Sequence, residues 1–236
     1  MELRVREVAK LFAVPERRIY EWIKERGLPA QRISGQHRFN RVELLEWATA
    51  HQVHVSSEIF ADAANGSAHP PGFAEALQAG GIFHSVGVSD RESALRTIVT
   101  NLPLPADVDR EFLVDLFLAR EALASTGIGD GIAIPHVRTP IVLHVRTPLV
   151  SLCLLAAPVE FGAMDGKPVH ALFSLISPTV RTHLHLLSRL AFALRDAGFK
   201  GAITRHASAE EILNEARRVE AGLVQPVIVA NKEGQR

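Results

Sequence analysis

The chain has 236 residues, which is enough for one large domain or two compact ones. Its 26 Lys and Arg residues balance its 26 Asp and Glu residues, so no field of the whole molecule favours nucleic acid or a membrane surface. A single cysteine, Cys153, excludes a disulfide framework, and no apolar run approaches the ~20 residues that span a bilayer. We therefore expect a cytoplasmic protein with no targeting segment.

The first 52 residues predict a small, slightly basic unit that begins with two short helices. Apolar residues at helical spacing over 5–12 predict the first helix. PERRIYEWIKERG predicts the second, because Pro15 suits a first helical turn and Gly27 suits a helix end. Two helices joined this closely are typical of a helix-turn-helix.

A hairpin and a third helix follow in the same unit. Extended runs on either side of Ser34-Gly35 predict the hairpin, and Asn40 with Glu43 forms a capping box for the helix. The order of elements is that of a winged helix-turn-helix, in which the second helix enters the major groove and the wing contacts phosphates.

The stretch VREVAKLFAVPERRIYEWIKERGLPAQRISGQHRF resembles the excisionase and MerR-type DNA-binding family, and the resemblance covers nearly all of residues 1–51. It implies that DNA is contacted from the helix and from the wing by Arg17, Arg18, Tyr20, Lys24, Arg32, His37 and Arg38. The alternative for each side chain is an ordinary solvated surface. Val14 departs from the family, which commonly places a Ser or Thr cap there, and this weakens the helix start.

Residues 53–76 are rich in Ala, Ser, Gly and Pro and predict a linker with one short helical segment. They separate the unit of residues 1–52 from a larger unit of residues 77–222, and residues 223–236 form a tail. In the larger unit, helical patterns begin after Ser89, Asp109 and Ser208, and Leu149–Ala156 and Val169–Ile176 are predicted as buried strands. Alternation of helices and apolar strands predicts an α/β fold.

The segment REALASTGIGDGIAIPH lies before the first of these strands. Its glycines, Gly127, Gly129 and Gly131, allow tight turns whose N–H groups face an anion. The apolar residues and the proline that follow hold His136, and a neutral imidazole is a competent nucleophile toward phosphorus near neutral pH. Further donors for a phosphoryl group are Arg120, Thr126 and a second histidine.

AREALASTGIGDGIAIPH, EFGAMDGKPVHALFSLISP and RTHLHLLSRLAFAL resemble enzyme IIA of the mannitol/fructose class of the phosphotransferase system, including its nitrogen-regulatory branch, over about residues 77–219. The resemblance implies a mixed, mostly parallel five-stranded sheet flanked by helices. It implies that His136 accepts a phosphoryl group from a histidine-containing phosphocarrier protein, that His183 stabilises that group, and that Arg120 is the family's arginine before the S-T-G loop.

Two residues depart from the family pattern. Well-known members carry asparagine at the position of Asp130, whose carboxylate would repel a phosphoryl group unless it points away. Members also often have glycine or proline where Val137 follows the histidine.

The sequence HVRTP occurs at residues 136–140 and again at 144–148. His144 follows an apolar run rather than the glycine-rich segment, so we predict a structural or surface role for it. A metal pair of His183 and His185 is disfavoured, because residues two apart point to different faces of a helix and no further ligands join them. We expect no metal and no cofactor, and Cys153 has no phosphate-binding loop after it.

The sequence therefore predicts a cytoplasmic transcriptional regulator that binds double-stranded DNA and is controlled by phosphorylation of His136 by the phosphocarrier protein. A protein-docking module without phosphotransfer and a plain sugar-transport component are the alternatives. A metal hydrolase would need bound zinc. Small winged units often bind DNA as homodimers, but the chain has no coiled-coil heptads to enforce one. The DNA target, the sign of regulation and the oligomeric state stay open.

Overall fold

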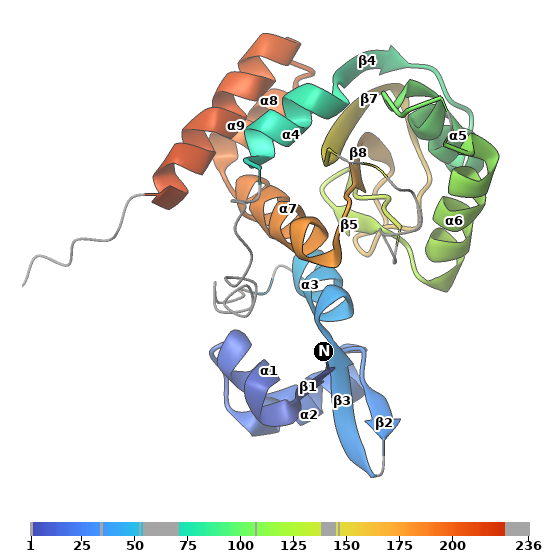
Figure 1. Cartoon of the computed structure of the whole chain (residues 1–236). Helices are drawn as coiled ribbons and strands as arrows, with labels where there is room; N and C mark the ends of the chain where they lie inside the picture. Colours follow the sequence, from blue (N-terminus) through green and yellow to red (C-terminus); the bar gives the residue numbers. More distant parts are fainter. Residues whose placement is uncertain are drawn as a thin grey trace, which may run out of the picture.

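The computed structural model describes residues 2–33, 35–51, 53, 71–106, 108–137, 145 and 147–224. Figure 1 shows a small unit at the N-terminus and a larger unit of helices around a sheet. The small unit consists of β1 (Glu2–Arg4), α1 (Val5–Leu11), α2 (Glu16–Glu25), β2 (Gln31–Ile33), β3 (Gln36–Asn40) and α3 (Arg41–Ala50). The predicted order of two helices, hairpin and third helix is confirmed.

The two predicted helices of the small unit begin and end for local reasons. After α1 the backbone of Ala13 has a φ of 53°, which stops the helix, and Pro15 then precedes α2 with its carbonyl accepting from the Arg18 N–H at 2.9 Å. At the other end Gly27 has a φ of 64° and the Leu28 N–H donates to the Trp22 carbonyl at 3.0 Å. A glycine in the left-handed region with this bond is a Schellman end.

Aromatic side chains hold the three helices of the small unit together. The rings of Phe12, Trp22 and Trp47 lie with centroids 5.2–5.9 Å apart, and all three residues are buried. The sheet has the order β1-β3-β2 with antiparallel pairings. The sequence did not predict β1, because three residues are too few to show an alternating pattern.

The larger unit has a five-stranded sheet with the order β4-β7-β8-β6-β5. Its elements are α4 (Phe73–Gly80), β4 (Ile82–Val86), α5 (Arg91–Asn101), α6 (Arg110–Leu123), β5 (Gly127–Gly129), β6 (Ile132–Ala133), β7 (Leu149–Val159), β8 (Val169–Ile176), α7 (Val180–Ala193), α8 (Ala197–Thr204) and α9 (Ala209–Val224). Figure 1 shows α5 and α6 on one side of the sheet and α4, α7, α8 and α9 on the other. The α/β class is confirmed.

The sheet is mixed, as predicted, but parallel and antiparallel pairings occur equally. β4 pairs with β7 and β6 with β8 in parallel, whereas β7–β8 and β5–β6 are antiparallel. The antiparallel pairs are joined by short connections, the turn at Asp130-Gly131 and the loop at 160–168. A parallel pair needs a crossover of a dozen or more residues, so these short links exclude it.

The helices of the larger unit differ from the sequence predictions in three places. The cap of α5 is Asp90, which exchanges hydrogen bonds with Ser93, and the predicted cap Ser89 only supports it. Phe112, expected on the apolar stripe of α6, is 44% exposed. Helix α4 begins at Phe73, inside the stretch predicted as a linker, and packs on β7 and α9.

The N-terminus of α4 is satisfied by a side chain that is distant in the sequence. The Glu220 carboxylate on α9 accepts hydrogen bonds from the N–H groups of Phe73 at 2.6 Å and Ala74 at 3.2 Å. A carboxylate suits a helix N-terminus, where unpaired N–H groups and the helix dipole are both positive. This contact ties α9 to the beginning of the larger unit.

Helix α3 joins the two units, because it lies against α7 and β5 of the larger one (Figure 1). Buried residues from both units form one continuous apolar cluster. A cavity of about 530 Å³, the interdomain cavity, is lined by α3, the β5–β6 turn, α7, α8 and the end of α9. No helix in the described part of the chain is long and apolar enough to cross a membrane. His144 and half of the residues in the two HVRTP copies lie outside the described residues.

Candidate phosphoryl site and DNA-binding face

His136 lies just after β6, where its backbone forms a parallel bridge with Leu175 of β8. Burial holds the residue firmly, since only 3% of it is exposed. The preceding Ile134 N–H donates to the Thr126 carbonyl at 3.0 Å, which extends the β5–β6 pairing up to the histidine. The imidazole is thus carried by sheet structure on both sides.

The hydrogen bond of the His136 ring fixes its tautomer. Nδ1 lies 2.6 Å from the carbonyl oxygen of Ile134. A carbonyl only accepts, so Nδ1 of the neutral ring carries the proton and Nε2 keeps the lone pair. Nε2 is therefore the nitrogen that can act as a nucleophile.

His183 lies beside His136, as the resemblance implied. It sits in the first turn of α7, whose N-cap Thr179 accepts from the Thr182 N–H at 3.1 Å. The ring centroids of His136 and His183 are 5.2 Å apart with an interplanar angle of 40°, and His183 is fully buried. Two buried imidazoles from different elements thus meet at one place, which is the arrangement that a nucleophile and a supporting donor need.

Arg120 and Thr126, also predicted as donors, have structural partners in this state. A guanidinium nitrogen of Arg120 donates to the Ala124 carbonyl at 2.8 Å, at the end of α6. The Thr126 hydroxyl donates to Glu121 at 2.6 Å, and its N–H donates to the same carboxylate at 3.0 and 3.1 Å. The hydroxyl hydrogen is therefore committed to Glu121, a buried carboxylate whose role in fixing the S-T-G loop the sequence reasoning missed.

The three glycines predicted to cradle a phosphoryl group form the β5–β6 hairpin and its turn. Gly129 and Gly131 have φ values of 94° and 73°, which favour glycine. A Cβ on Gly131 would lie 2.4 Å from Cδ2 of His170, and one on Gly127 would lie 2.7 Å from the Ala163 Cβ. Close packing is thus a second reason for glycine at these positions. The anion-binding role of the three glycines stays a prediction.

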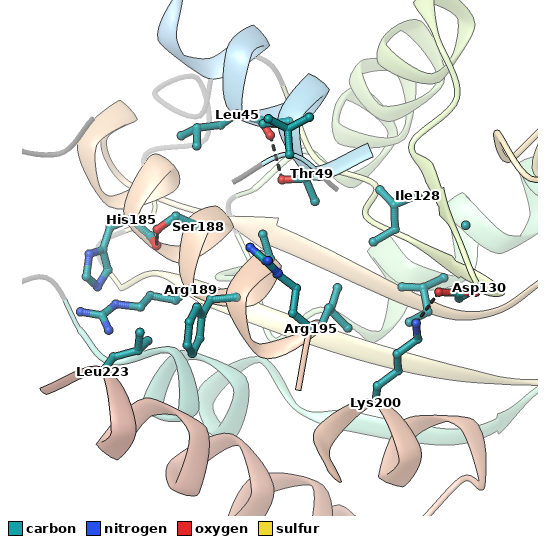
Figure 2. Close-up of a pocket in the computed structure, with 17 residues that line it drawn as sticks. Leu45, Thr49, Ile128, Asp130, His185, Ser188, Arg189, Arg195, Lys200 and Leu223 are labelled. Carbon is teal, nitrogen blue, oxygen red and sulfur yellow. Dashed lines mark hydrogen bonds and ion pairs between the residues drawn. The ribbon is translucent and has the colours of Figure 1, made fainter. Parts of the chain in front are cut away.

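Asp130 is neutralised by lysines. Its carboxylate pairs with Lys200 of α8, drawn as a dashed line in Figure 2, and lies 3.5 Å from the Lys167 ammonium. The Lys200 hydrogen bond holds the pKa of Asp130 below its usual value. The backbone N–H of Asp130 donates to the Asp165 carboxylate at 2.8 Å, and this hydrogen bond lowers the pKa of Asp165. The repulsion expected from a carboxylate at this position is therefore offset.

The other notable histidines and the cysteine are accounted for by packing. His185 lines the interdomain cavity while His183 contacts His136, so the two point to different sides of α7 as predicted. Burial lowers the pKa of His185 and of His170, whose ring lies 5.7 Å from that of His206. Burial raises the pKa of the Cys153 thiol to about 11. Within the described residues no three His, Cys, Asp or Glu side chains gather as metal ligands would.

The predicted DNA-facing residues of α2 share an exposed surface. Lys24 is exposed, and Arg17 and Arg18 both pair with Glu21, at 3.1 and 3.0 Å. The Arg17 side chain is 90% exposed, so its ion pair is screened by water and is easily given up to a phosphate.

The wing continues this surface. Tyr20 of α2 contacts His37 of β3 edge to face with centroids 5.8 Å apart, which joins the helix to the hairpin. Arg32, opposite His37 in the ladder, is exposed, and Arg38 donates to Gln36 at 2.9 Å. The cations of the helix and of the wing are thus held on neighbouring elements, as a winged unit requires.

Comparison with known families agrees with both halves of this description. Residues 75–217 match the model described as "Phosphoenolpyruvate-dependent sugar phosphotransferase system, EIIA 2", which is more than half of the chain. The chain belongs to this EIIA family. Residues 2–52 match a helix-turn-helix domain, so the chain joins a helix-turn-helix domain to an EIIA domain.

Individual relatives cover mainly the larger unit. The nitrogen regulatory protein of Pseudomonas aeruginosa is 36% identical over 123 residues, which are 51% of this chain and 76% of that protein. The fructose-specific EIIA component of Haloferax volcanii is 40% identical over 88 residues, 36% of this chain and 55% of that protein. The chain thus spans three quarters of the first relative and about half of the second.

Solved structures give the same fold for the EIIA domain. The nitrogen regulatory protein IIA-Ntr of Neisseria meningitidis is 28% identical with a TM-score of 0.53, and the match covers 61% of this chain and 97% of that one. The mannitol IIA of Escherichia coli is 25% identical with a TM-score of 0.51, covering 59% and 98%.

Proposed function

We propose that this chain is a cytoplasmic transcriptional regulator that binds double-stranded DNA through its N-terminal unit and is controlled by phosphorylation of His136. The phosphoryl donor is a histidine-containing phosphocarrier protein of the phosphotransferase system. The EIIA family of residues 75–217 and the helix-turn-helix domain of residues 2–52 support the two halves of the proposal.

One observation carries the phosphoryl half. His136 presents Nε2 as its lone-pair nitrogen, and its ring lies 5.2 Å from that of His183. Phosphoryl transfer depends mostly on positioning and on electrostatic stabilisation of the transferred group. A rigid nucleophile with a second imidazole beside it meets both needs.

The direct test is transfer of labelled phosphate from phosphoenolpyruvate through enzyme I and the phosphocarrier protein. We expect label on the wild type and none on His136→Ala or His136→Gln, with melting temperatures of both variants measured to confirm that they fold. His144→Ala should be labelled like the wild type. Absence of label on the wild type, or label that survives at His136→Gln, would contradict the phosphoryl half.

Control of DNA binding follows from the charge that phosphorylation adds. A phosphoryl group brings about −1.5 to −2 charges to a position where His136 is 3% exposed. A charge of this size is not tolerated in a buried site without rearrangement of its neighbours. Helix α7 carries His183 and also lies against α3, so a displacement there reaches the DNA-binding unit.

The second candidate function is a docking module that is never phosphorylated. The burial of His136 favours it, because a protein donor reaches Nε2 only after local opening. Comparing DNA affinity of the wild type, His136→Ala and a His136→Asp mimic separates the two. Phosphorylation control predicts that the mimic differs from both others by several-fold, whereas a docking module predicts three equal affinities.

A further inference from the structure

The interdomain cavity is a concave space shared by the two units. Its volume of about 530 Å³ falls within the range typical of small-molecule sites, about 300–1,000 Å³. Such sites occur preferentially between domains. Leu45 and Val53 come from the N-terminal unit, and Ile128, Ile132 and Phe192 form apolar walls on the other side.

Cationic side chains lie at both ends of this apolar lining. Arg189, Arg195 and Lys200 line the cavity together with one carboxylate, Asp130, among the described residues. Figure 2 shows Asp130 engaged with Lys200 at one end and Arg189 at the other end beside His185. Burial lowers the pKa of His185, and Arg189 disfavours its protonation further.

Arg189 lies at the end of the cavity away from the Asp130–Lys200 pair. Among the described residues it forms no ion pair, and Glu220, the carboxylate that lines a neighbouring small pocket with it, is engaged with the N-terminus of α4. A half-buried guanidinium binds carboxylates, sulfonates and phosphates through charge-assisted hydrogen bonds.

We propose that the interdomain cavity binds a small organic anion with an apolar body. The anionic group pairs with Arg189, and the body fills the space between α3 and the β5–β6 turn. The ligand contacts both units, so its binding energy favours the arrangement in which α3 is docked on α7. This binding needs neither DNA nor phosphorylation, and its test is independent of both.

The test is titration of the full chain with the fluorescent anion 1-anilinonaphthalene-8-sulfonate and, in parallel, with uncharged N-phenyl-1-naphthylamine, which has the same rings. We expect saturable binding of one sulfonate per chain, displaced by octanoate and at least several-fold less well by octanol. No saturable binding, or equal displacement by octanoate and octanol, would overturn the proposal.

Variants locate the site. Thr49→Trp fills the cavity from α3 and Ala191→Trp fills it from α7, so each should abolish saturable binding, with circular dichroism confirming the fold.

Arg189→Gln should weaken binding of the sulfonate about fivefold, as expected for loss of a partly exposed charge pair, and leave the affinity for the uncharged dye within about twofold. Arg217→Gln removes an exposed arginine of α9 outside the cavity and should change neither. Unchanged sulfonate binding in both filled variants would place the anion elsewhere.

Discussion

The surface of α2 that we propose to face DNA and the His136–His183 pair lie at opposite extremes of exposure. The side chain of Arg17 is 90% exposed, whereas His136 and His183 are 3% and 0% exposed. Surface cations act on a phosphate backbone through water, so each contributes modestly and salt weakens them all. Buried groups act on one atom at a fixed distance, so the loss of one is not compensated by a neighbour.

The largest effect should come from substitution in the buried His136–His183 pair. His183→Ala should lower the initial rate of phosphoryl transfer to His136 about a hundredfold, the cost of removing one donor to a transferred group. His185→Ala, on the same helix but facing the interdomain cavity, should stay within about twofold of the wild type.

His183→Gln serves as the control for packing, because it retains a hydrogen-bonding group of similar length. Its rate should lie between those of the wild type and His183→Ala, while the three melting temperatures are compared. Equal loss in His183→Ala and His185→Ala would show that α7 as a whole, and not the His183 imidazole, supports the transfer.

A glycine pair extends the comparison from side chains to the backbone. Gly131 and Gly166 both have positive φ, 73° and 68°, but a Cβ would be 2.4 Å from His170 at Gly131 and would meet nothing within 4 Å at Gly166. We expect Gly166→Ala to lower the free energy of unfolding by about 1–2 kcal/mol and Gly131→Ala by about 2–4 kcal/mol, since steric overlap adds to strain. Urea denaturation measures both, and equal losses would show that the hairpin turn moves away from His170.

Local features of the fold could be predicted from the sequence. Strand β8 has the predicted bounds Val169–Ile176, and Asp109 and Ser208 stand at the predicted helix starts with hydrogen bonds to Phe112 and Glu211. The cap of α5 was wrong by one residue, because Ser89 and Asp90 are both good caps and only the reciprocal bonding with Ser93 decides between them.

Long-range features could not be derived in the same way. The meeting of His136 and His183 depends on how β6 and α7 pack, and only the family resemblance pointed to it. Glu121 was missed because nothing in its own helix shows that it folds back onto Thr126. The interdomain cavity has no sequence signature, since it arises where α3 docks on the larger unit.

On the exposed side of the comparison we expect smaller and more uniform effects. Arg17→Ala should weaken binding to duplex DNA several-fold at low salt and reduce the slope of log affinity against log salt by about 1, the value for one phosphate contact. Arg96→Ala removes an exposed arginine from α5, where it pairs with Glu92 and Glu111, and should leave both quantities unchanged. An unchanged salt slope in Arg17→Ala would remove Arg17 from the DNA interface.

The smallest effect concerns pH and comes from half-buried histidines. Burial, with a contribution from neighbouring His206, lowers the pKa of His170 from its ordinary value of 6.5. The unfolded chain therefore takes up a proton at higher pH than the folded one. The contribution of His170 to the free energy of unfolding is complete above about pH 6.5 and is lost as the pH drops toward the folded pKa. The lowered pKa values of carboxylates such as Asp130 and Asp165 stabilise the fold above their ordinary value of 3.8. This contribution is lost only as the pH falls below that value.

Urea midpoints measured between pH 7.5 and 5.5 therefore report histidines and not these carboxylates. We expect the midpoint to fall with pH in the wild type and to fall less in His170→Gln, which has no group to protonate at that site. His185 contributes in the same direction through its own lowered pKa, so a residual decline should remain in His170→Gln and diminish further when His185→Gln is added. Identical declines in the wild type and the double variant would mean that the half-buried histidines His170 and His185 do not govern stability in this pH range.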